Sequence, residues 1–290
     1  KPMPVVFCFG ADPLLAQVAG MEIPYGINEL DYAGAIKGEP IEVIEGKMTG
    51  LPVPAAAEIA VEAEVSPTET LQEGPYSEWT GYSAYEKHME PAIKVLSVLH
   101  RKDPIITGLT TSASPKAAQF GKETAGVDHR CILRSAMIWN EMEAAGVPGV
   151  TGVYCHPAGG SRFWIVVSIK QMAPGHAKQA GAVASQCGAA AFSGRYTVVV
   201  DDDIDPTNDF AVLWAICTRS NPEKDIDILR GCRTGNLDPM IAREEEKLNS
   251  RAIIDACRPY RESGEFVPVA KFDPEIRKRV IQRYGEGLYE

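Results

Sequence analysis

Positive charge is absent from a long stretch of this chain. No lysine or arginine lies between Lys47 and Lys87, and no arginine precedes Arg101. The same stretch is rich in glutamate, with Glu58, Glu62, Glu64, Glu69, Glu73, Glu78 and Glu86. A carboxyl group buried among like charges has a raised pKa unless a cation reaches it from elsewhere in the fold. The sequence therefore predicts crowded carboxylates that lack a local counter-charge.

Basic clusters and long apolar runs are also missing. The formal net charge is −10 and the pI is near 5.1, without any block rich in lysine and arginine, which argues against a nucleic-acid partner. No apolar run approaches the ~18 residues that can span a bilayer, and the N-terminus shows no signal-peptide pattern. We therefore expect a cytoplasmic protein with no membrane partner.

Paired cysteines are missing too. The seven cysteines are scattered singly, with no C-x-x-C pair and no cysteine and histidine cluster at zinc spacing. Such a set is typical of a reducing compartment and of thiols that pack in a core. The 290 residues are 45% hydrophobic, which is enough for one large core or two ordinary ones.

Two of the glutamates belong to a turn built from glycine and proline. The segment reads Glu73-Gly74-Pro75-Tyr76-Ser77-Glu78-Trp79-Thr80-Gly81-Tyr82. Crowding and burial of carboxyl groups are the means by which proteins keep a proton donor near neutral pH. Glu73 and Glu78 are therefore candidates for acid–base chemistry, and the plainer alternative is a solvated loop.

Apolar patterning divides the chain into two halves. Short strands are predicted in the first half at 4–9, 41–45, 58–65, 92–99 and 104–107, with a helix near 14–19, which favours a barrel or sandwich. Within 58–65 the residues Ile59, Val61, Ala63 and Val65 should form the buried face, opposite the glutamates.

Helices and strands alternate in the second half, which indicates an α/β layer. Helices are predicted at 130–145, 176–190 and 208–217, and strands at 151–155, 163–169 and 196–200. The charged segment 273–286 is predicted to be a helix that docks on another subunit.

Several signatures, in order along the chain, resemble the UbiD-type decarboxylases, the relatives of ferulic acid decarboxylase that use prenylated FMN. They are Gly10-Ala11-Asp12-Pro13, Pro24 to Glu29, Leu51-Pro52-Val53-Pro54-Ala55, Glu73 to Tyr82, His100-Arg101, Asp202-Asp203-Ile204-Asp205, Trp214-Ala215 and Asp255-Ala256. The resemblance implies a mixed α+β and α/β fold. A partial split β-barrel that binds the flavin would span 1–125, an α/β oligomerisation domain 126–270 and a C-terminal helix 271–290.

The same resemblance implies an activity. The protein would be a reversible carboxy-lyase that decarboxylates, without oxidation, an aromatic or α,β-unsaturated carboxylic acid. Prenylated FMN would be the electron sink, Glu73 and Glu78 would flank its reactive ring, and Glu78 would be the proton donor.

Further site residues follow from the resemblance alone. Glu29 matches a ligand of a divalent cation, Mn²⁺ or Mg²⁺, and Met21 matches a backbone carbonyl near a monovalent ion such as K⁺. Pro24 would contact the cofactor, and Arg195 would stand in for a phosphate-binding lysine that is absent from 188–191. The substrate pocket would comprise Trp79, His129, Ile132 and Leu237, with His129 also open to a purely structural role.

The sequence departs from the family in one respect. The arginine of the family's catalytic site and the asparagine and histidine of its metal site belong to an N-terminal portion with no counterpart here. We therefore expect a cleaved chain or part of a larger polypeptide, in which an N-terminal segment or partner chain of a homo- or hetero-oligomer supplies these groups. The alternatives are a non-catalytic subunit of a multi-subunit carboxylase and, less favoured, an FMN-binding oxidoreductase.

Three other features suggest no chemistry. The acidic run 201–205 is expected to cap helices and bind backbone amides. The glycines of 156–161 lack the strand and helix context of a nucleotide-binding loop. His88, His100 and His176 show no pattern of partners, and no role is assigned to them.

Overall fold

The computed structural model describes residues 1–85, 87–106, 108, 127–241, 246–260, 266–270 and 273–285, and at 76, 77, 83–85 and 127–129 it describes the backbone alone. An antiparallel sheet with the order β1-β4-β7 organises the first half, from β1 (Met3–Phe9), β4 (Ile59–Glu73) and β7 (His88–His100). Two small hairpins, β2 (Val43–Glu45) with β3 (Pro52–Pro54) and β5 (Tyr76–Ser77) with β6 (Ser83–Tyr85), accompany it. Within the described residues these sheets do not close into a barrel.

Two short helices precede the long strands. Helix α1 (Pro13–Val18) is capped by Asp12, whose side chain accepts a hydrogen bond from the N–H of Leu14. Helix α2 (Glu29–Lys37) is capped by Asn28 and ends at Gly38, whose φ of 80° is costly for a residue with a Cβ. The helix expected near 14–19 is confirmed, whereas α2 was not predicted.

Strand β4 differs from its prediction in length and in burial. It continues to Glu73, beyond the expected end at 65, and the expected strand at 104–107 is absent from the described residues 104–106. Glu62 was assigned to the exposed face but is fully buried. Its carboxylate accepts hydrogen bonds from the N–H groups of Met48 and Thr49 and from the Thr49 hydroxyl, each 2.9 Å long. These donors explain why a buried glutamate is tolerated.

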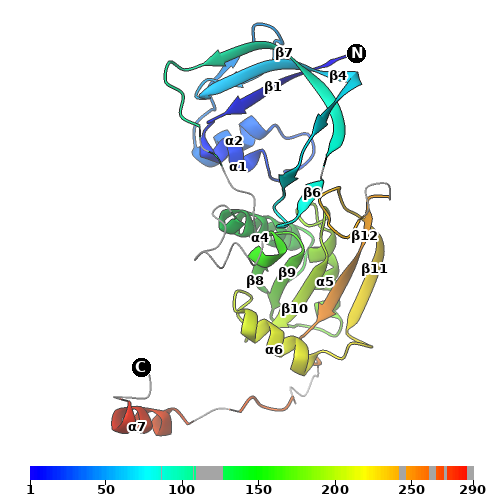
Figure 1. The fold of residues 1–290 in the computed structure, drawn as a ribbon. Helices are drawn as coiled ribbons and strands as arrows, with labels where there is room; N and C mark the ends of the chain where they lie inside the picture. The colour runs from blue at the N-terminus through cyan, green and yellow to red at the C-terminus, as the bar shows by residue number, and fades with distance from the viewer. Residues whose placement is uncertain are drawn as a thin grey trace.

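A mixed five-stranded sheet organises the second half, in the order β11-β12-β10-β9-β8 (Figure 1). Its strands are β8 (Val150–Cys155), β9 (Trp164–Ile169), β10 (Tyr196–Asp201), β11 (Ile226–Arg233) and β12 (Leu248–Asp255). The central strands β9, β10 and β12 are parallel, and an antiparallel strand borders each edge. The expected strands β8, β9 and β10 are confirmed, and β11 and β12 were not predicted.

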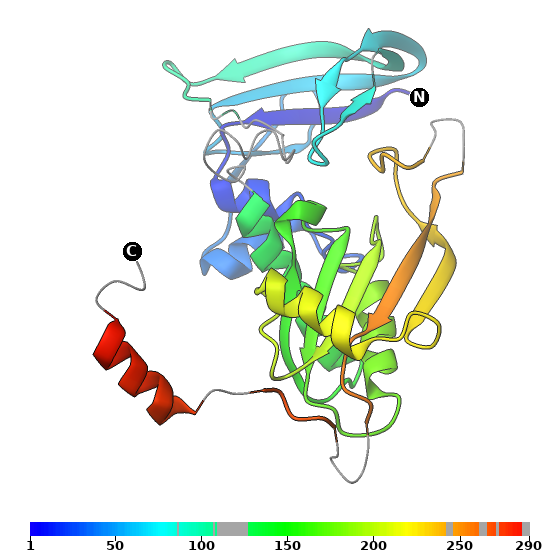
Figure 2. The ribbon, with the colours of Figure 1, turned by 60° about the horizontal axis from the view of Figure 1, so that its bottom comes forward.

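Helices cover both faces of this sheet. Helices α4 (Val127–Ala144) and α5 (His176–Gln186) enclose a core with Ile165, Val167 and Val199. Helix α6 (Asp209–Arg219) packs on the opposite face against Val166, Val198 and Val200 (Figure 2). Alternate residues of β9 thus enter different cores, as the two-residue period of a strand requires.

Helix α5 ends earlier than the predicted residue 190. Cys187 is extended, and the carbonyls of Ser185, Ala190 and Ala191 accept hydrogen bonds from the buried guanidinium of Arg251. The last carbonyls of a helix have no N–H partner within the helix. The Arg251 side chain supplies donors to these carbonyls, so the helix can end here without leaving them unpaired.

The last helix, α7 (Pro274–Tyr284), stands apart from both sheets in each view and buries none of its residues (Figures 1 and 2). It lies within the predicted helical segment 273–286. No helix within the described ranges is long and apolar enough to cross a membrane.

Candidate active site

The hairpin β5–β6 presents Glu78 and Trp79 towards the second half of the chain. The N–H of Glu78 donates to the carbonyl of Tyr82, and the N–H of Gly81 donates to the carbonyl of Glu78, both at 2.9 Å. The Trp79 ring lies 5.0 Å from the Phe163 ring and covers Gly160, where an added Cβ would collide with the indole. The turn is therefore held against the loop that precedes β9.

Glu78 has the environment expected of a proton donor. It is partly buried, and desolvation raises the pKa of its carboxyl group although the N–H of Trp79 partly offsets the effect. A raised pKa keeps a larger fraction of the carboxyl group protonated near neutral pH.

Glu73 has a different environment from that of Glu78. Its side chain is 53% exposed, and its Oε2 atom lies 3.6 Å from Nε2 of His88, whose side chain is 1% exposed. The same nitrogen lies 3.0 Å from Oε1 of Glu90. Glu73 therefore lies beside an imidazole from the neighbouring strand, a polar neighbour that a count of lysine and arginine along the sequence does not include.

A cavity of about 660 Å³ lies between the loop before α2 and the segment after α5. Pro24 lines it together with Gly188, Ala191, Phe192 and Arg233. One cavity is thus lined both by Pro24, a predicted cofactor contact, and by the segment 188–191, from which the phosphate-binding lysine is absent.

Charges around this cavity are largely neutralised within the chain. Glu141 accepts hydrogen bonds from the N–H groups of Gly188 and Ala189, so these amides are already used. Glu22 lies 2.6 Å from both Arg134 and Arg162. The guanidinium of Arg233 lies over the ring of Phe192, 5.6 Å from its centroid. The Glu22 pairs were not predicted, because the residues are more than a hundred positions apart.

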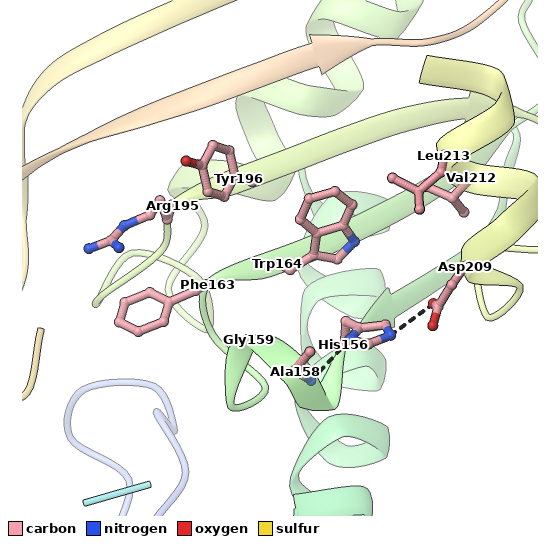
Figure 3. A pocket seen from close by; sticks show the side chains of 10 residues that line it. All are labelled: His156, Ala158, Gly159, Phe163, Trp164, Arg195, Tyr196, Asp209, Val212 and Leu213. Carbon is pink, nitrogen blue, oxygen red and sulfur yellow. Dashed lines mark hydrogen bonds and ion pairs between the residues drawn. The ribbon is translucent and has the colours of Figure 1, made fainter. Parts of the chain in front are cut away.

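A second cavity, of about 380 Å³, lies between α6 and the first residues of β9 and β10 (Figure 3). Phe163, Trp164 and Tyr196 give it an aromatic wall. His156 is fully engaged there, because its Nδ1 accepts from the N–H of Ala158 and its Nε2 lies 2.8 Å from Asp209. This histidine is thus held in place as a structural group.

Arg195 lines the second cavity, not the cavity that contains Pro24. It pairs with the buried carboxylate of Asp238 and lies over the Phe163 ring, 4.6 Å from the centroid. Pro24 and Arg195 thus line different cavities, although both were predicted to contact the cofactor.

The remaining predicted residues occupy dispersed positions. Met21 packs in the small core around α1 and α2, and Glu29 is the exposed first residue of α2. Ile132 lies exposed on α4, and Leu237 is partly buried in the loop after β11. His129 belongs to α4, but its side chain lies outside the described residues.

The first cavity fits a flavin mononucleotide in chemical terms. Such a cofactor needs apolar or aromatic surface for its rings and positive charge for its phosphate. Phe192 and Pro24 provide the surface, and Arg233 provides the charge.

The acidic run 201–205 binds backbone amides as expected, but it does not cap the following helix. Arg219 binds Asp201 and Asp203, and Asp205 accepts from the N–H and hydroxyl of Thr207, whereas the N-cap of α6 is Asn208. Burial raises the pKa of the Cys155 and Cys187 thiols to about 12, as expected for packing thiols.

Two family models match most of the chain. Residues 1–115 match the 3-octaprenyl-4-hydroxybenzoate carboxy-lyase Rift-related domain, and residues 129–256 match the C-terminal domain of the same carboxy-lyases.

Solved structures of UbiD-class enzymes have the same fold. HmfF from Pelotomaculum thermopropionicum, in complex with FMN, is 27% identical with a TM-score of 0.76, over 98% of this chain and 60% of that one. The apo 3,4-dihydroxybenzoic acid decarboxylase AroY of Klebsiella pneumoniae is 27% identical with a TM-score of 0.71, over 99% and 59%. Vanillic acid decarboxylase of Sedimentibacter hydroxybenzoicus, in closed form, is 24% identical with a TM-score of 0.79, over 100% and 59%. The chain spans about 60% of the length of these proteins.

Proposed function

The chain belongs to the UbiD family of carboxy-lyases, and we propose that the complete protein reversibly decarboxylates an aromatic or α,β-unsaturated carboxylic acid with prenylated FMN. The observation that carries this proposal is the environment of Glu78. Its carboxyl group is partly buried, has a raised pKa and stands on a turn that Trp79 anchors against Phe163.

In this proposal Glu78 moves the proton. When bound, prenylated FMN supplies the electron sink for loss of carbon dioxide. Glu78 then gives its proton to the carbon that has lost the carboxyl group, and it accepts that proton in the reverse direction. The packing of Trp79 on Phe163 holds the turn, so that the Glu78 carboxyl stays oriented.

Several residues would hold the cofactor. Arg233 would bind the phosphate, and Pro24 and Phe192 would contact the ring system. Arg233 is better placed than Arg195, because Arg195 already pairs with Asp238. Met21 would contribute its carbonyl near a potassium ion. Glu29 would bind Mn²⁺ or Mg²⁺, since an exposed carboxylate offers the oxygen ligand that such hard cations prefer.

The substrate would lie beside Trp79, with Ile132, Leu237 and His129 as the other pocket residues. Aromatic and aliphatic side chains of this kind suit the apolar body of an aromatic or unsaturated acid.

Completion of the site by other groups is part of the proposal. An N-terminal segment or a partner chain would supply an arginine near Glu73, and an asparagine and a histidine near Glu29. We propose a cytoplasmic homo- or hetero-oligomer, with domains at 1–125, 126–270 and 271–290. Its seven free cysteines suit a reducing compartment.

The first test is Glu78→Gln in the complete protein loaded with prenylated FMN. We expect decarboxylation and substrate-dependent exchange of solvent deuterium to fall by at least ~100-fold, the lower end of general acid catalysis, while the flavin stays bound. Product formation, isotope exchange and flavin absorbance are measured on the same preparation.

The matched control is Glu69→Gln. Glu69 is an exposed glutamate of strand β4, and its replacement should leave the rate at the wild-type value. Full turnover by the Glu78→Gln variant would rule out the assigned proton donor. A native protein that retains neither flavin nor turnover would instead support the alternative, a non-catalytic subunit of a multi-subunit carboxylase.

A further inference from the structure

The register of β4 and β7 brings three polar side chains together. Glu73 pairs directly with His88, and Glu90 lies two residues further along β7, opposite Leu71. Side chains two residues apart on a strand share a face, so all three groups lie on the same side of this ladder. Their ligand atoms lie within 4.8 Å of one another.

The imidazole is the buried member of the group. The His88 side chain is 1% exposed, whereas those of Glu73 and Glu90 are 53% and 43% exposed. The two glutamates line one open groove of about 450 Å³ together with Leu71, Pro91 and Ile93. His88 is therefore fixed by its surroundings while the carboxylates reach into the groove.

The distances from Nε2 of His88 to the two carboxylates show that this nitrogen is a hydrogen-bond donor. An ionised carboxylate only accepts hydrogen bonds, so Nε2 of His88 must carry a hydrogen where it lies 3.0 Å from Oε1 of Glu90. At 3.6 Å, Oε2 of Glu73 is just beyond a normal hydrogen bond to the same atom. A small movement of the exposed Glu73 side chain would bring its carboxylate onto this donor.

We propose that His88 is a positioning residue for Glu73: the two carboxylates share the single hydrogen on Nε2, with Glu90 fixing the orientation of the ring and Glu73 drawn towards the same donor. This inference rests on the proposed function, together with the expectation that Glu73 and Glu78 flank the reactive ring of the flavin. It adds to that function a partner for Glu73 that this chain itself supplies, from strand β7 just beyond the stretch without lysine or arginine.

The test is a double-mutant cycle in the complete protein loaded with prenylated FMN. The variants are Glu73→Gln, His88→Gln and the double variant, with kcat and KM measured for each. We expect His88→Gln to lower kcat by about tenfold or more and to change KM by less than about twofold, since misplacing an acid–base group weakens the chemical step. In the Glu73→Gln background, His88→Gln should change kcat by less than about twofold.

A purely structural role would give a different result. The effects of losing His88 and losing Glu73 would then multiply, and the double variant would be slower than the wild type by the product of the two single factors. His100→Gln, in the same strand β7, is the control and should behave as wild type. Flavin content and thermal midpoint identify variants that fail to fold. If His88→Gln fails to fold, His88→Asn takes its place.

Two failures can be told apart. If Glu73→Gln keeps the wild-type rate, the proposed role of Glu73 is wrong and the inference falls with it. If Glu73→Gln is impaired but His88→Gln is not, or if their effects multiply, the inference alone is overturned. A stoichiometric metal ion that is lost in His88→Gln would also overturn it, because the imidazole would then be a ligand.

Discussion

Three glutamates of one acidic stretch have three different electrostatic environments. Glu62 is fully buried and receives several hydrogen bonds, Glu73 is half exposed beside His88, and Glu78 is partly buried with the N–H of Trp79 as a donor that only partly offsets its desolvation. Burial alone would raise the pKa of Glu62, but donors on Thr49 and Met48 hold it below its usual range. The number of charges along the sequence is the same for all three residues. It can suggest that Glu78 has a raised pKa, but it cannot show that Glu62 has a lowered one.

The lowered pKa of Glu62 predicts a pH-dependent stability. A depressed folded-state pKa stabilises the protein above the ordinary glutamate pKa of about 4.3, and this contribution is lost as the pH falls through the folded value. Glu62→Gln should therefore lower the thermal midpoint at pH 7, because its amide places hydrogens against the donors of Met48 and Thr49.

Thermal midpoints of wild type and variant, measured from pH 7 down to pH 3, check this prediction. The difference should shrink as the pH falls below the ordinary glutamate pKa of about 4.3, and it should be lost once the pH has passed the lower folded-state pKa. Glu69→Gln serves as the exposed control. A difference that stays constant over the whole range would show that the charge of Glu62 is not the cause.

At the scale of elements, helix α4 carries two isoleucines for which we expect different roles, one in stability and one in substrate binding. Ile138 is fully buried against the five-stranded sheet, whereas Ile132 is 66% exposed on the same helix. Ile138→Ala should destabilise the protein by about 3 kcal/mol through lost burial and a residual cavity. Ile132→Ala should change stability by less than about 0.5 kcal/mol and should act on substrate KM instead.

Urea unfolding and steady-state kinetics on the two variants provide the measurement. Each variant is the control for the other, because both remove the same atoms from one helix. An unchanged KM profile in Ile132→Ala, across aromatic acids of different size, would remove Ile132 from the proposed pocket.

Local signals explain which elements the sequence could predict. The strands β8, β9 and β10 and the helices α4 and α6 have clear apolar periods and were predicted. Helix α2 was missed although Asn28 and Gly38 are recognisable caps, so its signal was present in the sequence. The continuation of β4 to Glu73 had no such signal, because it depends on pairing with β7.

The same reasoning applies to the candidate site. The turn 73–82 was visible as a motif, and Glu78 follows from it. The partnership of Glu73 with His88 requires the register of two strands, and the approach of Pro24 to Arg233 requires the two halves to meet. Neither can be read from neighbours in the sequence.

At the scale of the whole molecule, one cluster of charges links the two halves within the part of the chain that the structure describes. Glu22, in the loop between α1 and α2, binds Arg134 on α4 and Arg162 before β9, at 2.6 Å each. Desolvation lowers the pKa of the Arg162 guanidinium, and the nearby charge of Arg134 lowers it further, so Glu22 offsets a costly pair of like charges. The apolar contact of Trp79 with Phe163 adds a second link.

The position of Glu22 predicts how the halves come apart. Glu22→Gln should leave Arg134 and Arg162 without a carboxylate and destabilise the protein by about 2 kcal/mol, below the cost of breaking a fully buried pair because Glu22 is partly exposed. Native-state hydrogen exchange should rise at residues 21–30 and 160–163 and stay unchanged in β10, whose amides belong to the separate core of the five-stranded sheet. Glu39→Gln, which removes an exposed partner of Lys37, is the matched control. Uniform exchange across both halves would show that Glu22 stabilises the whole fold and not the junction, whereas a local increase would identify the junction as the part that must be held for Pro24 and Arg233 to share one cavity.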